Sequence, residues 1–431
     1  MDAALEVNHW CHEKAVYRPS DIRTRSPLAT VKTAFGRCGE ESTFTVAALR
    51  AVGIPARQVY TPRWAHTDDN HAWVETWVDG KWYFLGACEP EPVLNMAWFN
   101  APVARGMLMR AKVFGKYNGP EDIMKETTGY TEVNVTDNYT TTANVTILVV
   151  DKNDKPVEGA LVEFKIYNYA EFFSVAKKVT EKEGTATLSG GKGDMLVWAS
   201  KDGEFGFKKV TFGKKDTYKI TLEDEAVVRG KIFDFDIIPP KKGLIPIDVT
   251  KEQKEENAKR LAEEDRIRQA YESTFYTAEK AADLAKRLSL DKDALTHIML
   301  ESRGNWKEIR QFLRDTPIKN RERAMALLNV ISTKDLKDTE VPVLQDHLKY
   351  SINTKSELFT EYILNPRVAN ELLTPYKAFF QKNISKQEQQ AYQNNPQKLF
   401  NWVKDNIKIN PKMNPQRVAI MPKGVWKSRV A

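Results

Sequence analysis

One cysteine, Cys38, stands between glycines in GRCGEESTFTVAALRAVG and is the first candidate for chemistry. We predict a turn and then a helix from Cys38 to Ala51, with Gly53 suited to the helix stop. The residues at helical spacing, which we expect to pack inward, are Phe44, Ala47, Ala48 and Ala51. In the first helical turn, backbone N–H groups and the helix dipole favour a thiolate and can bind an oxyanion. The alternative is a packed, inert cysteine.

A histidine that follows is the candidate general base. His71 begins the alternating run HAWVETWV, 33 residues after Cys38. We predict that this run is a strand, that Asp79-Gly80 forms a hairpin turn, and that WYFL is the return strand. The preceding RQVYTPRW also predicts a strand. A neutral imidazole within reach of a thiol takes its proton and gives a thiolate–imidazolium pair. A structural histidine at a strand start is the alternative.

Length and composition limit the classes that this chain can belong to. A chain of 431 residues predicts two or three domains, and 42% hydrophobic with 29% charged residues is typical of a soluble globular protein. No apolar run is long enough to predict a transmembrane segment. The net charge of +7 is spread over interleaved acidic and basic residues, which does not favour nucleic-acid binding. Three widely spaced cysteines do not form a zinc motif, and we expect no metal and no cofactor.

The chain divides into three compositional zones, which predict an α+β multidomain fold. Residues 1–118 hold the Cys38 helix and the Trp-rich strands. Residues 130–224 contain short alternating runs between turns, which predict an antiparallel β-sandwich. Residues 250–431 are rich in helix formers and predict an α-helical region. A weak echo of the first zone at the C-terminus leaves open that this region leads into a truncated further domain; chance similarity is the favoured interpretation.

The first zone resembles a known family. The combined motif GRCGEES…LRAVGIPARQVY…NHAWVETWVDGKWYFLGACEP is similar to the transglutaminase-like superfamily, and within it to the peptide N-glycanase-like branch. The resemblance covers about residues 5–110. It implies a papain-related α+β core and acyl transfer through a thioester, with Cys38 as nucleophile and His71 as general base. The implied activity is that of a protease, amidase or peptide N-glycanase-like hydrolase acting on peptide, protein or glycopeptide amides.

The sequence departs from the superfamily at the third catalytic position. Gly86, in FLGACEPE, stands where relatives have an aspartate, and Glu89 is our first substitute. The other carboxylates near in sequence are Asp68, Asp69 and Glu75. Glu75 lies four strand positions from His71, roughly 13 Å away. A backbone carbonyl or an amide would also serve, because the role is control of tautomer and geometry. The alternative function is a catalytically degenerate module that binds peptide or glycan without turnover.

Three further residues are assigned to oxyanion or substrate binding: Trp10, Gly39 and Trp73. An upstream Trp in this superfamily can help to bind the oxyanion, which an indole N–H is able to do. A core Trp on the first helix is the alternative for Trp10. We expect Cys88 to be buried beside the site.

The predicted sandwich resembles the carboxypeptidase-regulatory type of module in VTILVVDKNDKPVEGALVEFKIYN and the turns that follow. This resemblance implies a spacer or a substrate-positioning platform on secreted and surface proteins. The aromatic residues of YNYAEFF either contact a ligand or pack in the core. We therefore expect a periplasmic, cell-surface or secreted protein, with its export signal and possible further domains outside this chain.

Overall fold

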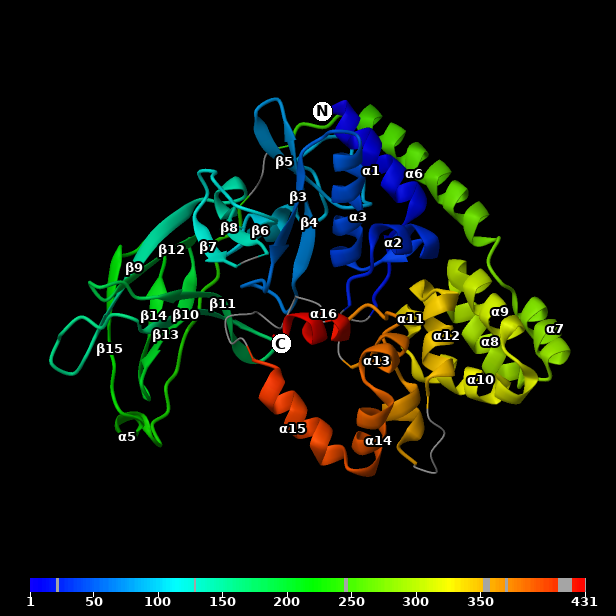
Figure 1. The fold of residues 1–431 in the computed structure, drawn as a ribbon. Helices are drawn as coiled ribbons and strands as arrows, with labels where there is room; N and C mark the ends of the chain where they lie inside the picture. The colour runs from blue at the N-terminus through cyan, green and yellow to red at the C-terminus, as the bar shows by residue number, and fades with distance from the viewer. Residues whose placement is uncertain are drawn as a thin grey trace. The chain divides into compact units, whose positions relative to one another are not determined.

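The computed structural model of the chain describes residues 1–20, 23–127, 129–243, 247–351, 357–368, 371–409 and 421–430 (Figure 1). It has the predicted fold class: an α+β core is followed by a β-sandwich and then by a helical region. Two compact units are present, each built from two stretches of chain: Met1–Val16 with Glu41–Asp265, and Tyr17–Glu40 with Arg266–Ala431. These units do not follow the three predicted domains, whose boundaries stay a prediction.

The first unit is built on an antiparallel sheet in the order β5-β4-β3-β6-β8-β7. Its strands are β3 Ala56–Thr61, β4 His71–Val78, β5 Lys81–Leu85, β6 Arg110–Val113, β7 Ile123–Glu126 and β8 Thr131–Asn134. The predicted hairpin is confirmed, because Val78 pairs with Lys81 and both turn residues, Asp79 and Gly80, have positive φ. The sheet continues beyond residue 118, since β7 and β8 form its far edge.

Helices α1 Asp2–Lys14 and α3 Cys38–Ala51 accompany this sheet, and α3 has the predicted bounds (Figure 1). The predicted inward face of α3 is confirmed at Phe44 and corrected elsewhere: the buried residues from Glu41 onward are Glu41, Ser42, Phe44, Thr45 and Leu49. Ala51 is exposed. Polar residues replace alanines on this face because they have partners there; Ser42 Oγ accepts a hydrogen bond of 2.6 Å from Gln58 on β3.

The two faces of the sheet bury separate apolar clusters, because successive strand residues point to opposite sides. One cluster gathers aromatic side chains around Trp73 and includes Trp64, Phe84, Phe99 and Tyr139. The other joins α1 and α3 to the opposite face and includes Ala4, Leu49, Val74 and Leu85. His71 and Trp73 are two residues apart on β4, so they share the aromatic face.

The β-sandwich also belongs to the first unit. Its strands are β9 Thr142–Val150, β10 Leu161–Asn168, β11 Glu171–Val179, β12 Thr185–Gly191, β13 Asp194–Lys201, β14 Glu204–Thr211 and β15 Thr217–Thr221. They form the sheets β11-β10-β13-β14 and β12-β9-β15 around one shared apolar core. The predicted all-antiparallel arrangement is corrected at one pair: β15 runs parallel to β9, because the chain crosses from one sheet to the other between β14 and β15. Helix α5 Glu225–Val228 and the long α6 Lys251–Glu272 follow.

The second unit is largely helical. It contains α7 Ala278–Leu288, α8 Lys292–Glu301, α9 Trp306–Asp315, α10 Arg321–Val330, α11 Thr333–Asp338, α12 Val341–Lys349, a π-helix Thr360–Leu364, α13 Lys377–Asn383, α14 Lys386–Asn394, α15 Pro396–Asn406 and α16 Pro422–Ser428. Helices α7 to α12 share an apolar core. The segment Tyr17–Glu40, with α2 Pro27–Thr33 and the short β2 Phe35–Gly36, belongs to this unit and leads directly into α3.

Candidate active site

The nucleophile candidate is followed in the chain by a buried carboxylate. Cys38 is the first residue of α3 and is half-buried. Two residues later, Glu40 is fully buried and accepts hydrogen bonds from the Arg37 backbone N–H (3.0 Å) and from Arg25 Nε (2.9 Å). The Nζ of Lys334, on α11, lies 3.1 Å from the same carboxylate. The contact with Arg37 resembles half of a capping box, so the carboxylate fixes the residue that precedes Cys38.

Opposite charges keep this carboxylate ionised. Burial alone raises the pKa of Glu40, but the hydrogen bond and charge of Arg25, the charge of Lys334 and the Arg37 N–H together lower that pKa to about 2. Arg25 also donates to the carbonyl of Phe35 at 2.8 Å, in the strand just ahead of α3. The chain on the N-terminal side of Cys38 is therefore held by buried charges.

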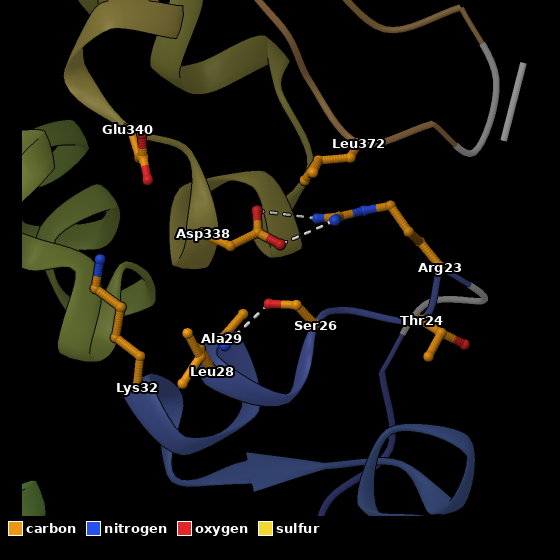
Figure 2. Close-up of a pocket in the computed structure, with 9 residues that line it drawn as sticks. All are labelled: Arg23, Thr24, Ser26, Leu28, Ala29, Lys32, Asp338, Glu340 and Leu372. Atoms are coloured by element: carbon orange, nitrogen blue, oxygen red, sulfur yellow. Dashed lines mark hydrogen bonds and ion pairs between the residues drawn. The ribbon is translucent and has the colours of Figure 1, made fainter. Parts of the chain in front are cut away.

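A second ion pair ties the same segment to α11. Both terminal nitrogens of Arg23 bond to the carboxylate of Asp338, at 2.8 and 3.1 Å, as Figure 2 shows. Next to this pair is a pocket of about 400 Å³ between α2 and the loop that follows α11. Its rim carries Lys32, whose amine donates to Asn305, and the side chain of Glu340. The pocket mixes both charges, and neither Cys38 nor His71 lines it.

Gly39 is buried, and a side chain there would require the guanidinium of Arg37 to shift. A Cβ atom added to Gly39 would lie 2.7 Å from Arg37 Nη1, and Arg37 also donates to Thr24 at 2.9 Å. The missing side chain thus makes room for a guanidinium beside the start of α3. The predicted oxyanion role of the Gly39 backbone stays a prediction.

The base candidate lies in an aromatic surrounding instead of a charged one. His71 is the first residue of β4, pairs with Thr61 on β3, and is 9% exposed. Its ring centroid lies 4.9 Å from that of Trp98, 4.8 Å from that of Phe99 and 5.7 Å from that of Trp73. Burial lowers the pKa of His71 to about 4, so the imidazole is neutral at pH 7 and able to accept a proton.

One nitrogen of this ring is left without a bond. Among the residues that the structure describes, the buried Nε2 of His71 has no hydrogen-bond partner. Buried polar atoms normally have one, and the exceptions often mark functional sites. In the superfamily that the sequence resembles, an aspartate at position 86 would be expected to serve the histidine, and this chain has Gly86 there.

The predicted substitute, Glu89, occupies the space over Gly86. A Cβ atom added to Gly86 would lie 2.9 Å from Glu89 Oε2, and the two residues form an antiparallel bridge across a tight turn. Burial raises the pKa of Glu89 to about 6. Its carboxylate accepts a hydrogen bond of 2.9 Å from the indole N–H of Trp98. That Glu89 orients His71 stays a prediction.

The other carboxylates proposed for this role have different partners. Glu75 is buried and accepts hydrogen bonds from Arg57 Nε (2.6 Å) and from the Tyr139 hydroxyl (2.6 Å). Asp68 accepts the backbone N–H of Tyr169 at 2.7 Å. Asp69 accepts the N–H of the next residue and shapes its own turn. Glu75 therefore holds Tyr139, whose ring packs edge-on against Trp73.

Two tryptophans that the sequence assigned to the site have different surroundings. Trp73 is fully buried, and its indole N–H donates to the Tyr139 hydroxyl at 2.8 Å. Trp73 thus packs in the core against the His71 ring, and its contact with substrate stays a prediction. Trp10 is 45% exposed and packs against Phe44 of α3, which rules out the core alternative for this residue.

The turn that carries Glu89 is clamped by α1. The side-chain amide of Asn8 donates to the Gly86 carbonyl at 2.8 Å, and its oxygen accepts the Cys88 N–H at 3.0 Å. Cys88 is buried as predicted, 3.6 Å from the Thr45 hydroxyl on α3. Burial, with smaller contributions from neighbouring groups, raises the pKa of this thiol well above its usual range, which disfavours the nucleophilic thiolate form.

The β-sandwich reaches the loop that leads into His71. The side-chain amide of Asn168, on the β10–β11 hairpin, donates to the carbonyls of Trp64 and Thr67, at 2.9 and 2.7 Å. The guanidinium of Arg63 stacks over the Phe173 ring at 4.3 Å. The aromatic run YNYAEFF therefore supports this loop, and packing explains at least Phe173.

Sequence reasoning missed the aromatic wall made by Trp98 and Phe99 and the ion partners of Glu40. Trp98 and Phe99 end the irregular segment PEPVLNMAWF, whose apolar residues have neither helical nor strand periodicity. The carboxylate had a local signal, because an acidic residue in the first turn of a helix can reach back to the N-cap backbone.

No metal site is evident among the described residues, in which no three or more His, Cys, Asp or Glu side chains are grouped to hold an ion. His9 and His12 instead each place Nδ1 2.8 Å from the carboxylate of Glu264. In the same part of the chain, no helix is both long and apolar enough to span a bilayer.

Comparisons with known proteins gave a match to one family model and several similar solved structures. Residues 1–87 match the family model of the transglutaminase-like superfamily. Among solved structures, one similar chain is "a Putative Cysteine Protease from Cytophaga hutchinsonii", with 24% identity over 21% of this chain and 32% of that chain and a TM-score of 0.19. Another is a Streptococcal ancillary pilin, with 14% identity over 40% and 57% of the two chains and a TM-score of 0.18. The comparison with curated proteins gave no match.

These matches cover less than two thirds of either solved chain, at 32% and 57%. The family match supports a cysteine-based hydrolase or acyltransferase at the general level.

Proposed function

We propose that this protein is a cysteine hydrolase or acyltransferase that acts on peptide or protein amides, with Cys38 as nucleophile and His71 as general base. One observation carries the proposal: a cysteine and a histidine each stand at the start of a secondary-structure element. A half-buried cysteine starts a helix, and a buried histidine that is neutral at pH 7 starts a strand of the superfamily's core. The two residues fall in different compact units, so their meeting is part of the proposal.

The reaction follows from these groups. His71 takes the proton of the Cys38 thiol as the sulfur forms a bond to the amide carbon. Backbone N–H groups at the start of α3 stabilise the oxyanion. The C–N bond then breaks, and the leaving amine receives the proton from His71. Water or an amine attacks the resulting thioester and regenerates the thiol.

A thiolate favours the imidazolium beside it. Burial by itself keeps the imidazole of His71 neutral. An adjacent thiolate supplies the opposite charge that a buried imidazolium needs. The glycopeptide amide, as in removal of a glycan from asparagine, is the narrower substrate class within this proposal, and the sequence resemblance alone supports it.

A specific observation favours the alternative of a binding module without turnover. Gly86 stands at the position of the expected aspartate, and no hydrogen-bond partner for His71 Nε2 is found in the described part of the chain. Removing the aspartate of a comparable triad costs about four orders of magnitude in turnover, so this gap matters.

Alkylation separates the two functions. The full-length chain is treated with iodoacetamide at pH 7, and the rate at Cys38 is followed by peptide mass spectrometry, with buried Cys11 and Cys88 as internal controls. The proposal predicts a rate at least about tenfold above that of free cysteine, because a thiolate–imidazolium pair raises the thiolate fraction. It also predicts that His71→Ala removes this excess. A rate equal to that of free cysteine in both proteins would leave the binding module as the function.

A further inference from the structure

We propose that Trp98 is the positioning residue for His71, and that Glu89 acts on the imidazole through Trp98 instead of through a direct hydrogen bond. The inference rests on the proposed function, because it concerns how the general base is held. It assigns a role to a tryptophan that no sequence motif marked.

Trp98 contacts both His71 and Glu89. The Trp98 ring lies 4.9 Å from the His71 ring, at an interplanar angle of 58°. The indole N–H of the same residue donates to Glu89 Oε2 at 2.9 Å. Trp98 is 60% exposed. An indole that is anchored at its nitrogen and packed on the imidazole restricts the rotation of the His71 ring.

The space over Gly86 explains why Glu89 faces the indole. The carboxylate of Glu89 lies where a side chain at position 86 would begin, with Oε2 at 2.9 Å and Cβ at 3.1 Å from an added Cβ atom. An aspartate at residue 86 and this position of Glu89 therefore exclude each other. After β5 the carboxylate near residue 86 comes from Glu89, and it accepts its hydrogen bond from Trp98.

Packing completes the restraint on the other sides of the ring. Phe99, fully buried, meets His71 edge-on at 4.8 Å, and Trp98 and Phe99 are perpendicular to each other. Trp73 stacks on the imidazole within 24° of parallel. Three aromatic rings thus fix the plane of His71, and its buried Nε2 has no hydrogen bond among the described residues that could do so. Trp98 is the exposed member of the three, so it can be replaced without opening the core.

Four variants test the assignment: Trp98→Phe, Trp98→Ala, Glu89→Gln and the double variant Gly86→Asp/Glu89→Ala. The readout is the pH profile of Cys38 alkylation in the full chain. We expect Trp98→Ala to reduce the rate at pH 7 about tenfold and Trp98→Phe about threefold, because the phenyl ring keeps the packing but loses the anchor. Glu89→Gln should reduce it about threefold, since an amide oxygen still accepts from the indole. The double variant restores a carboxylate at residue 86 and should recover the wild-type rate within about threefold.

Trp77 supplies a matched control. It is 41% exposed, lies on the same strand as His71 and packs on Trp82. Trp77→Ala should leave the alkylation profile unchanged.

Two results would overturn the inference while the proposed function stands. If His71→Ala removes the excess reactivity but Trp98→Ala does not, Trp98 has no positioning role. If Glu89→Gln is as slow as His71→Ala, Glu89 is a direct partner of the imidazole.

A second readout covers the case in which the wild type shows no excess reactivity and the proposed function fails. Nitrogen-15 NMR of labelled histidine reports the tautomer of His71 without any chemistry at Cys38. The inference predicts a single His71 tautomer in the wild type and in Trp77→Ala, and exchange broadening or a tautomer mixture in Trp98→Ala. An unchanged His71 signal in Trp98→Ala would overturn it.

Discussion

The surroundings of Cys38 and of His71, the two halves of the site that we propose, are built in opposite ways. Next to Cys38, a fully buried carboxylate, Glu40, is saturated by Arg25, Lys334 and a backbone N–H. Around His71 the neighbours are aromatic, and the described residues offer no hydrogen bond to its buried Nε2. One half is positioned by paired charges and the other by packing.

The difference matches what each group must do. A nucleophile at a helix start needs its backbone held in place, and charge-assisted hydrogen bonds to that backbone are directional and strong. A base must change its charge during the reaction. Burial of His71 favours the neutral imidazole, and the thiolate that we propose beside it supplies the charge that favours the imidazolium. The predictions below test each half, from the largest expected effect to the smallest.

Removing the buried carboxylate should have the largest effect. Glu40→Ala leaves Arg25 and Lys334 buried without their counter-ion, so we expect a loss of about 3–5 kcal/mol in the free energy of unfolding. Urea unfolding followed by circular dichroism measures it. Glu255→Ala, at an exposed ion pair with Lys251, should cost less than about 0.5 kcal/mol. If Glu40→Ala lowers the free energy of unfolding no more than Glu255→Ala does, paired charges do not stabilise the surroundings of Cys38.

Low pH should reduce the stability that Glu40 contributes to the folded chain. The pKa of Glu40 is lowered from 4.5 to about 2 in the folded chain. Its contribution to stability, about 3 kcal/mol, is therefore complete above about pH 4.5 and is lost as the pH falls from about 4.5 toward 2. Urea midpoints measured across this range should fall in the wild type and change less in Glu40→Gln. If the urea midpoints of the wild type and of Glu40→Gln fall in parallel with pH, the low pKa of Glu40 is contradicted.

On the aromatic half, Tyr139→Phe should cost about 1–3 kcal/mol. The change removes the hydroxyl that accepts from Trp73 and donates to Glu75, and it leaves both buried groups short of a partner. Thermal unfolding measures the loss, and Tyr167→Phe, at an exposed tyrosine, should change little. Equal losses of stability in the two variants would show that the hydrogen bonds of Tyr139 do not stabilise the aromatic face that carries His71.

The smallest effect is expected at the sandwich hairpin. Asn168→Ala removes two hydrogen bonds to the loop before His71 and should cost about 1–2 kcal/mol. Hydrogen exchange should become faster at residues 62–70 in this variant. Asn153→Ala, at an exposed turn residue, is the control and should leave exchange in that loop unchanged. Unaltered exchange in Asn168→Ala would mean that the sandwich does not support the site.

The parts of the site that the sequence predicted are those fixed by local chemistry. The bounds of α3 follow from its helix formers and Gly53, and the β4–β5 hairpin follows from strict alternation around Asp79-Gly80. Both features are set within about 15 residues, where periodicity and turn preferences act.

The parts that it missed depend on distant partners. Trp98 reaches His71 from an irregular segment, and Lys334 reaches Glu40 from the helical region. The inward face of α3 is predicted correctly at Phe44 but not at Ser42, a polar residue that is buried where it accepts a hydrogen bond from Gln58. Long-range pairing of polar groups leaves no period in a single sequence.

The most direct test of the whole account is the distance between Cys38 Sγ and the nearer ring nitrogen of His71 in a crystal structure of the full chain. The account predicts about 4 Å or less, close enough for proton transfer with small adjustment. A separation of about 8 Å or more that persists with a peptide amide bound would contradict it.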